Sequence, residues 1–335
     1  MKKEIVIYGA GKYGKVLKNT LAELGVEVSC FLETEVIGVN EYNGVPIMPI
    51  DSLSTNQNEN IIILLAISNR EVCQEVRLSL YRYGIRNKQI IRCADYIKNV
   101  LHKNFCVFCD EYVDFEPGGE VKGYVFEKYH IIGGGYRENC KCINCKSIDR
   151  ERWLYYVLKR HTKIFEEECS ILHFAPEKNV SKQIALQNAA SRYVKADIAY
   201  RRADYVVDMT NIEFEDNSFD YIIANHVLEH IEDEKKAISE LKRVLKPNGT
   251  LIISFPICAD FDTLEDKSII TKEDRLTAYG QEDHVRLYGK DYQDRLGNYG
   301  LKIKVFSPFK ELGAEEISEL GFIYDDIILM CSSIG

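Results

Sequence analysis

Residues 216–256, DNSFDYIIANHVLEHIEDEKKAISELKRVLKPNGTLIISFP, decide the fold of the C-terminal part of the chain. The apolar run at 219–226 predicts a strand, the apolar spacing of 233–245 predicts a helix, and the run at 250–256 predicts a second strand. A strand, a helix and a strand in this order are typical of a crossover between parallel strands. The stretch therefore predicts a parallel α/β sheet.

The same alternation continues on both sides of this stretch. Further apolar strands are predicted at 170–175, 192–198, 204–209, 301–308 and 326–332. Together they make seven strands, and the crossover logic makes the first five predominantly parallel. A helix over 147–165, capped by Ser147, is predicted to precede them. We therefore expect an α/β domain with a seven-stranded sheet over residues 150–335.

The blocks VLEHI at 227–231 and LKPNG at 245–249 carry a resemblance to a known family. With the strand pattern around them, residues 150–335 resemble the class I S-adenosylmethionine (SAM) dependent methyltransferases, with a core like that of methyltransferase type 11. The resemblance implies the seven-stranded fold, SAM as cofactor and methyl transfer as activity. It implies Asp197 as the acceptor of the ribose hydroxyls, Asp208 beside the adenine, and Met209 and Asn225 as further cofactor contacts.

The loop ILHFAPEKN at 171–179 falls at the cofactor position of this family, and it contains no glycine. SAM has no pyrophosphate, so a full nest of glycine amides is not required. We expect Ala175, Pro176 and Glu177 to line the methionine end of the cofactor, with Glu177 binding its amino group. The alternative is a loop that has lost its ligand, which would make the domain a pseudoenzyme.

The segment HVLEH at 226–230 also fits the H-x-x-E-H pattern of zinc metallopeptidases. His226 ends a predicted strand, so His226 and His230 are not expected to share a helix face, and no third ligand stands out in the sequence. We expect Glu229 and His230 to cap and pack near the rim of the site. His226, on the same rim, is a second candidate for a catalytic base.

The segment AYGQEDHVRLYGKDY at 278–292 lies where this fold commonly inserts acceptor-binding structure. His284 is the predicted general base, oriented by Asp283, and Arg286 is predicted to bind a phosphate or carboxylate of the acceptor. Further acceptor contacts are expected from Tyr279 and Gln281. The alternative is a polar loop that covers the sheet and leaves His284 on a solvated surface.

The first hundred residues show a second α/β pattern. A strand at 4–8 runs into a glycine turn and a helix, and the next strand ends on an acidic residue that can accept a ribose hydroxyl. We expect a Rossmann-like domain over 1–98 that binds a nucleotide or nucleotide-sugar through Gly9, Gly11, Gly14 and Glu33. The segment at 40–53 resembles the small nucleotide-binding domains of sugar acyltransferases. The alternative is a glycine turn kept for helix packing alone.

Four of the 11 cysteines form two C-x2-C pairs, in CVFC at 106–109 and CINC at 142–145. Two such pairs are typical of a tetrahedral zinc site, and four thiolates leave no open position for a substrate. We expect a zinc module over 99–149 with a structural Zn²⁺ held by Cys106, Cys109, Cys142 and Cys145. Cys140 is spare or replaces Cys142, and the alternative is a set of buried cysteines without a metal.

The composition limits the partners. The formal net charge is −9 and no run of five basic residues occurs, so neither a nucleic-acid surface nor a membrane surface is indicated. The first residues lack the features of a signal peptide, and no apolar run approaches the ~20 residues that span a bilayer. We therefore expect a cytoplasmic protein that acts on small molecules.

The combination of modules is similar to that of sugar C-methyltransferases, although their nucleotide-binding-like domain follows the core and the glycine-turn domain here comes first. The function predicted from the sequence is methyl transfer from SAM to a sugar, a nucleotide-sugar or a surface-glycan precursor. One alternative is an RNA methyltransferase with a zinc module, which the acidic balance disfavours. Another is a non-catalytic nucleotide-sugar-binding protein with a degenerate methyltransferase core.

Overall fold

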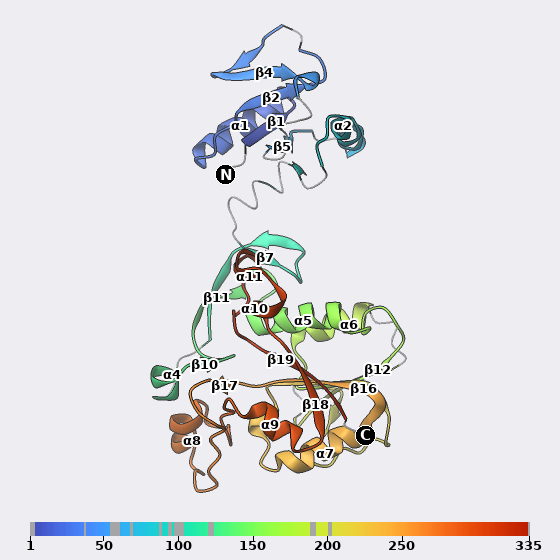
Figure 1. Cartoon of the computed structure of the whole chain (residues 1–335), viewed down its shortest axis with the longest axis vertical. Coiled ribbons are helices and arrows are strands. Elements are labelled where there is room, and N and C mark those ends of the chain that lie inside the picture. Colours follow the sequence, from blue (N-terminus) through green and yellow to red (C-terminus); the bar gives the residue numbers. More distant parts are fainter. Residues whose placement is uncertain are drawn as a thin grey trace. The chain divides into compact units, whose positions relative to one another are not determined.

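The computed structural model describes residues 4–36, 38–53, 61–67, 70–86, 89–92, 96, 104–119, 124–187, 192–199 and 203–333. The chain divides into two compact units, Met1–Lys103 and Asn104–Gly335. Figure 1 shows the elements of both units. The cysteine pairs and the C-terminal sheet belong to one compact unit. The finer division at residues 98 and 149 stays a prediction.

The first unit is a six-stranded sheet in the order β3-β4-β2-β1-β5-β6. All neighbouring pairs are parallel except β3 and β4. Apolar residues on both faces of β1 are buried, and α1 and α2 cover opposite faces. The elements are β1 (Glu4–Tyr8), α1 (Lys12–Glu23), β2 (Cys30–Glu33), β3 (Glu41–Tyr42), β4 (Val45–Pro49), a 3-10 helix (Ile50–Ser52), β5 (Ile61–Leu65), α2 (Arg70–Arg82) and β6 (Ile90–Arg92).

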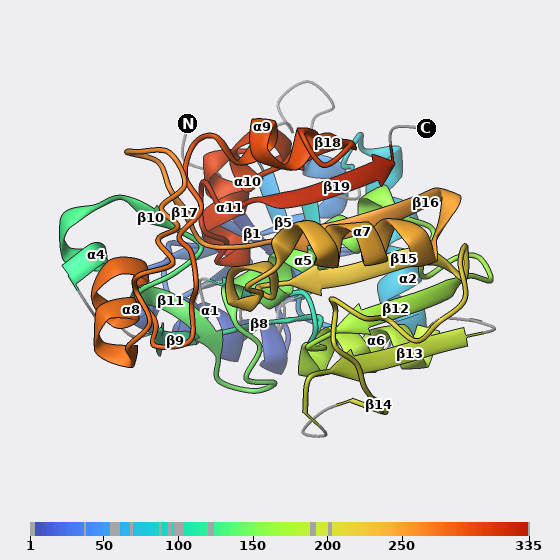
Figure 2. The ribbon, with the colours of Figure 1, turned by 90° about the horizontal axis from the view of Figure 1, so that it is seen from below.

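The second unit is built on a seven-stranded sheet in the order β14-β13-β12-β15-β16-β19-β18. The first five strands of this order run parallel, and β19 is antiparallel to both of its neighbours. Figure 2 shows β13, β12, β15, β16 and β19 side by side. The strands are β12 (Ser170–Phe174), β13 (Arg192–Asp197), β14 (Tyr205–Val206), β15 (Phe219–Asn225), β16 (Leu245–Ser254), β18 (Leu301–Phe306) and β19 (Ile328–Ser333).

Helices cover both faces of this sheet. The helices α5 (Asp149–His161), α6 (Lys178–Gln187) and α11 (Ala314–Leu320) pack on one face, and α7 (Glu234–Val244) and α9 (Tyr292–Gly297) pack on the other (Figure 1). Every residue of β12 is buried, as expected for a central strand covered on both sides. The prediction of an α/β fold with a parallel sheet core is confirmed.

The second unit also contains several short elements. They are β7 (Asn104–Cys106), β8 (Glu111–Val113), β9 (Phe115–Gly118), α4 (Tyr124–Lys128), β10 (Ile131–Ile132), β11 (Arg137–Cys142), the 3-10 helix Leu228–His230, β17 (Ile257–Cys258), α8 (Lys272–Tyr279) and α10 (Pro308–Glu311). The strands β7 and β8 pair with each other, as do β9 with β11 and β10 with β17. In the described part of the chain, no helix has the length and apolar character needed to cross a bilayer.

The start of α5 corrects one expectation. The helix begins at Asp149, and its N-cap residue is Ile148 rather than Ser147. The buried Ser147 hydroxyl instead lies 3.1 Å from the sulfur of Cys145. The helix cap predicted for Ser147 is therefore wrong, because its side chain faces the cysteine cluster.

Candidate active site

The order of the strands predicts a ligand crevice between the loops that follow β12 and β15. The chain leaves β12 toward β13 on one side and later returns to β15 on the other side, so the sheet order reverses beside β12. Ligands of open α/β sheets bind outside the carboxyl ends of the strands at such a point. The residues that follow β12 and β15 are in the left-handed region, Ala175 with φ 45° and His226 with φ 51°. Residues held in this conformation often occur at functional sites.

Side chains from three strands fix the loop that follows β12. One carboxylate oxygen of Glu177 lies 2.8 Å from His173 Nε2, and the other accepts from the Asn225 amide at 3.2 Å. The Ser254 hydroxyl donates to Asn225 Oδ1 at 3.1 Å. The carboxylate keeps further lone pairs and is 23% exposed, so it can still accept from a ligand amine. The predicted residues Glu177 and Asn225 thus lie together at the crevice.

Glu151 is a residue that the sequence did not indicate. Its carboxylate accepts from the backbone amides of Asn179 at 2.5 Å and Val180 at 3.3 Å, at the start of α6. Burial raises the pKa of Glu151. A carboxylate from α5 therefore occupies the helix terminus where other folds bind a phosphate. Its partners lie 28 and 29 residues away along the chain, which leaves no local sequence signal.

The remaining predicted cofactor residues differ in their exposure and surroundings. Asp197 ends β13 beside Ala175, whose backbone amide donates to Ala196 O at 2.8 Å. The exposed Asp208 carboxylate accepts from the Thr210 amide at 2.8 Å, in a local turn. The other residue, Met209, is only 2% exposed and belongs to the apolar core. Their contacts with SAM, like that of Pro176 beside Ala175, stay predictions.

His226 connects the crevice to a buried carboxyl group. Its ring nitrogens lie 3.2 and 3.3 Å from Arg150 Nη1, and Nδ1 lies 3.2 Å from Glu229 Oε1. Burial, followed by the charge of Arg150, lowers the pKa of His226. Glu229 is 1% exposed, and burial raises its pKa to about 8. His226 and His230 do not share a helix face, because β15 ends at Asn225 and a 3-10 helix begins at Leu228.

His284 is a buried residue with a neutral ring. It is 2% exposed, which corrects the alternative of a solvated surface position. Its Nδ1 atom lies 3.3 Å from the carbonyl oxygen of Tyr279, and burial followed by the neighbouring His230 lowers its pKa to about 4. The Asp283 carboxylate lies 3.4 Å from His230 instead, so Asp283 does not orient His284 as predicted.

The surroundings of Arg286 correct its expected role. The side chain is 0% exposed, and its Nη1 atom donates to the carbonyl oxygens of Leu228 and Ile231, both at 2.6 Å. Its Nη2 atom bonds Glu265 Oε1 at 2.8 Å. These contacts stabilise the loop after β15 and leave Arg286 away from any acceptor. Tyr279 is also buried, and its hydroxyl binds the backbone of Asp266.

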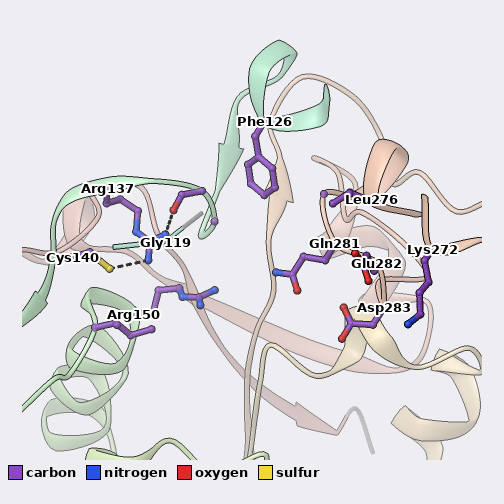
Figure 3. Close-up of a pocket in the computed structure, with 14 residues that line it drawn as sticks. Gly119, Phe126, Arg137, Cys140, Arg150, Lys272, Leu276, Gln281, Glu282 and Asp283 are labelled. Carbon is purple, nitrogen blue, oxygen red and sulfur yellow. Dashed lines mark hydrogen bonds between the residues drawn. The ribbon is translucent and has the colours of Figure 1, made fainter. Parts of the chain in front are cut away.

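A cavity of about 650 Å³ lies beside these residues (Figure 3). Arg137 and Arg150 lie on one side of it, and Lys272 and the segment 281–283 lie on the other, with Phe126 above. Arg137 is held by Asp149 at 2.7 Å and by the Cys140 sulfur at 3.3 Å. The lining combines cationic, acidic and amide groups, which suits a polar small molecule. Of the predicted acceptor contacts, Gln281 lines this cavity.

The four predicted zinc ligands come together. The sulfur atoms of Cys106 and Cys145 lie 3.6 Å apart, and those of Cys109 and Cys142 lie 3.8 Å apart. All four are within 4.8 Å of one another. Zn–S bonds of about 2.3 Å in a tetrahedron put the sulfurs about 3.8 Å apart, so the cluster fits Zn²⁺. Cys140 lies outside the cluster, so it does not replace Cys142.

The glycine turn of the first unit has the predicted local geometry. A side chain on Gly14 would lie 1.8 Å from the carbonyl oxygen of Gly9, whereas Gly11 has open space around it. The Ala10 backbone amide donates to Glu33 Oε1 at 2.5 Å, so the carboxylate ends β2 directly beside the turn. The turn and Glu33 thus share one sheet edge. Nucleotide binding there stays a prediction.

Comparisons with known proteins agree with the C-terminal fold. Residues 176–253 match the family described as methyltransferase domain. An arsenite methyltransferase of Aquipseudomonas alcaligenes is 34% identical over 79 residues, which are 22% of each chain. An uncharacterized protein of Methanocaldococcus jannaschii is 30% identical over 149 residues, 44% of this chain and 60% of that one.

An ajmaline N-methyltransferase of Rauvolfia serpentina is 26% identical over 114 residues, 34% of this chain and 36% of that one. Among solved structures, the PH0226 protein of Pyrococcus horikoshii is 18% identical with a TM-score of 0.37, and the match covers 55% of this chain and 92% of that chain. The chain spans between about a fifth and three fifths of the length of these three curated relatives. These matches support a methyltransferase domain at residues 176–253.

Proposed function

We propose that this chain transfers a methyl group from SAM to a polar small molecule. One observation carries the proposal: the stretch that matches the methyltransferase domain, 176–253, contains the residues that converge at the carboxyl ends of β12, β13 and β15. Of these, Glu177, Asp197 and Asn225 point to a ligand with an amine and a pair of hydroxyls. SAM has both groups.

The roles of these residues follow from their chemistry. The Glu177 carboxylate accepts hydrogen bonds from the cationic amino group, and Asp197 accepts them from the ribose hydroxyls. Since Glu151 already occupies the start of α6, this crevice suits a cofactor without a pyrophosphate. Methyl transfer is an in-line displacement in which the acceptor atom attacks the methyl carbon and the C–S bond breaks. The protein's contribution is to align the two reactants.

The acceptor is proposed to bind in the cavity beside Arg150. Its lining offers cations at Arg150 and Lys272 for a phosphate, and acidic and amide groups at 281–283 for hydroxyls. A sugar or nucleotide-sugar carries both kinds of group, so a sugar, nucleotide-sugar or surface-glycan precursor is the proposed acceptor class. Arg150 also bonds His226, which places the cavity next to the end of β15.

The test has two parts. Isothermal titration with SAM is expected to show one site per chain, which Glu177→Gln weakens and the exposed Glu166→Gln does not. Incubation with methyl-labelled SAM and a panel of nucleotide-sugars is then expected to label at least one sugar. A wild-type chain that binds no SAM would overturn the methyltransferase proposal. Labelling of RNA and of no sugar would overturn the acceptor class alone.

A further inference from the structure

We propose that Glu229, His230 and His284 form a binding site for a divalent transition-metal ion, separate from the four-cysteine cluster. One carboxylate oxygen and one ring nitrogen from each histidine lie within 4.8 Å of one another. The two imidazole rings are 4.7 Å apart between centroids, at an interplanar angle of 80°. Two neutral imidazoles and a carboxylate are a common ligand set for such ions.

The hydrogen bonds of the two rings leave the same nitrogen available on each. His284 Nδ1 lies 3.3 Å from the Tyr279 carbonyl, and His230 Nδ1 lies 3.3 Å from the Asp283 carbonyl. Carbonyl oxygens only accept, so each Nδ1 carries the proton and each Nε2 carries a lone pair. Metal-binding histidines have this arrangement, in which one nitrogen donates to the protein and the other binds the ion.

Glu229 supplies an independent observation. His226 lies against Oε1 at 3.2 Å, while Oε2 is buried and has no hydrogen-bond partner among the described residues. A buried oxygen without a partner is unfavourable, and more so when it is charged. A cation beside Oε2 would supply the partner that this oxygen lacks. His226 then acts as a positioning residue for Glu229.

The backbone around the three ligands is fixed before any ion binds. Arg286 holds the carbonyl oxygens of Leu228 and Ile231, which flank Glu229 and His230. The backbone amide of Val285, next to His284, donates to Glu229 O at 2.9 Å. Two segments far apart in the sequence are thus joined at the ligands themselves. Such support is what a preorganised metal site requires.

The ligand set also limits which ions can bind and what chemistry a bound ion can support. Mg²⁺ and Ca²⁺ prefer oxygen ligands alone, whereas Mn²⁺, Fe²⁺, Co²⁺ and Zn²⁺ accept imidazole. Three protein ligands leave open positions. Asp283, which precedes His284 in the sequence and lies 3.4 Å from His230, lines the proposed acceptor cavity (Figure 3). If the proposed methyl transfer holds, an acceptor hydroxyl at an open position would lose its proton to water more readily. Its oxygen would then attack the methyl carbon as the C–S bond breaks.

The test measures Mn²⁺ binding by electron paramagnetic resonance, without SAM or acceptor. Mn²⁺ prefers oxygen and nitrogen ligands, so a cysteine cluster kept loaded with zinc does not compete for it. We expect one saturable site per chain, weakened at least about tenfold by Glu229→Gln and by His284→Gln. His161→Gln, a histidine paired with Glu311 elsewhere, and Cys109→Ser should keep the wild-type affinity.

One further measurement uses the wild type alone. In the wild type, Mn²⁺ should broaden the imidazole proton signals of His230 and His284 before that of His161. This measurement does not depend on the folding of any variant. The absence of a saturable site, or equal affinity in Glu229→Gln and wild type, would overturn the metal site. A chain that binds Mn²⁺ at this site and no SAM would retain the metal site and overturn the proposed methyl transfer.

Discussion

Side chains at the ends of β12 and β15 fix the loop that follows β12, which contains no glycine. Glu177 is held by His173 and Asn225, and Glu151 binds the amides at the start of α6. Side chains in such a network are oriented before a ligand arrives, which lowers the entropy lost on binding. The loop 175–177 can therefore be rigid although it contains no glycine.

Asp197→Ala is expected to weaken SAM binding by about 2 kcal/mol, or roughly 30-fold, because a carboxylate that accepts two hydroxyls is lost. The residue is the last of β13, so the strand itself should form normally. Isothermal titration measures the change, with the exposed Asp262→Ala as the control. Unchanged affinity would show that the end of β13 does not contact the cofactor.

Arg286→Ala is expected to lower the free energy of unfolding by about 3–5 kcal/mol, because two buried carbonyl oxygens and Glu265 lose their partner. Lys290→Ala, on an exposed side chain, should change it by less than about 0.5 kcal/mol. Urea unfolding gives both values. A stable Arg286→Ala chain with weakened acceptor binding would instead support the role predicted from the sequence.

The site was only partly predictable at this scale. Strand ends follow from hydrophobic runs, so the pattern and the family resemblance predict the positions of Glu177, Asp197 and Asn225 at the ends of neighbouring strands. Arg286 is different, because its carbonyl partners lie 54 to 58 residues away and no local pattern encodes them. His284 was found as a lone histidine, but its pairing with His230 exists only in the folded chain.

Among the elements, the turn between β1 and α1 has the strictest steric requirement. Gly14→Ala should destabilise the first unit by about 3 kcal/mol or more, because the new Cβ would meet the Gly9 carbonyl at 1.8 Å. Gly11→Ala has open space and should cost much less. Hydrogen exchange of the β1 amides measures both. Equal protection in the two variants would contradict the turn geometry.

The turns after β7 and β11 are expected to hold one Zn²⁺ per chain. Cys142→Ser should lose the metal, whereas Cys140→Ser should keep it, since Cys140 bonds Arg137 outside the cluster. Elemental analysis of protein purified without chelator decides between them. Equal zinc content in the two variants, or none in the wild type, would rule out the assignment.

The spacing of apolar residues predicted which helices and strands form better than it predicted where they end. The helix expected at 233–245 is observed at Glu234–Val244, but the strand expected at 204–209 is only Tyr205–Val206. The strand lies at the edge of the sheet, where one side of the backbone is unpaired. The apolar residues after it turn away, since Met209 packs into the core. The spacing of apolar residues alone does not distinguish a strand from a segment that packs into the core.

For the whole molecule, the single tryptophan is a useful probe. Trp153 is fully buried in the second unit, between α5 and the sheet, so its fluorescence reports the unfolding of that unit alone. The first unit has no tryptophan. A change in stability measured in this way can therefore be assigned to one of the two units in the intact chain.

The last prediction concerns the pH dependence of this stability. Burial raises the pKa of Asp326 to about 7, and the side chain is only 4% exposed. An unfolded aspartate titrates near pH 4, so between about pH 4 and 7 the folded state holds a proton that the unfolded state has lost. Asp326 therefore makes the second unit less stable as the pH rises through this range, with no further change above it.

Asp326→Asn removes this effect. The stability of the variant minus that of the wild type should rise between pH 5 and 7, by up to about 1.4 kcal/mol per pH unit, and then level off. Urea unfolding followed by Trp153 fluorescence measures this difference at each pH. For the control, the exposed Asp294→Asn, the difference from the wild type should vary less with pH. A difference that is constant from pH 5 to 8 would mean that Asp326 is ionised in the folded chain, with Arg150, the largest of the charges that lower its pKa, holding it in that form.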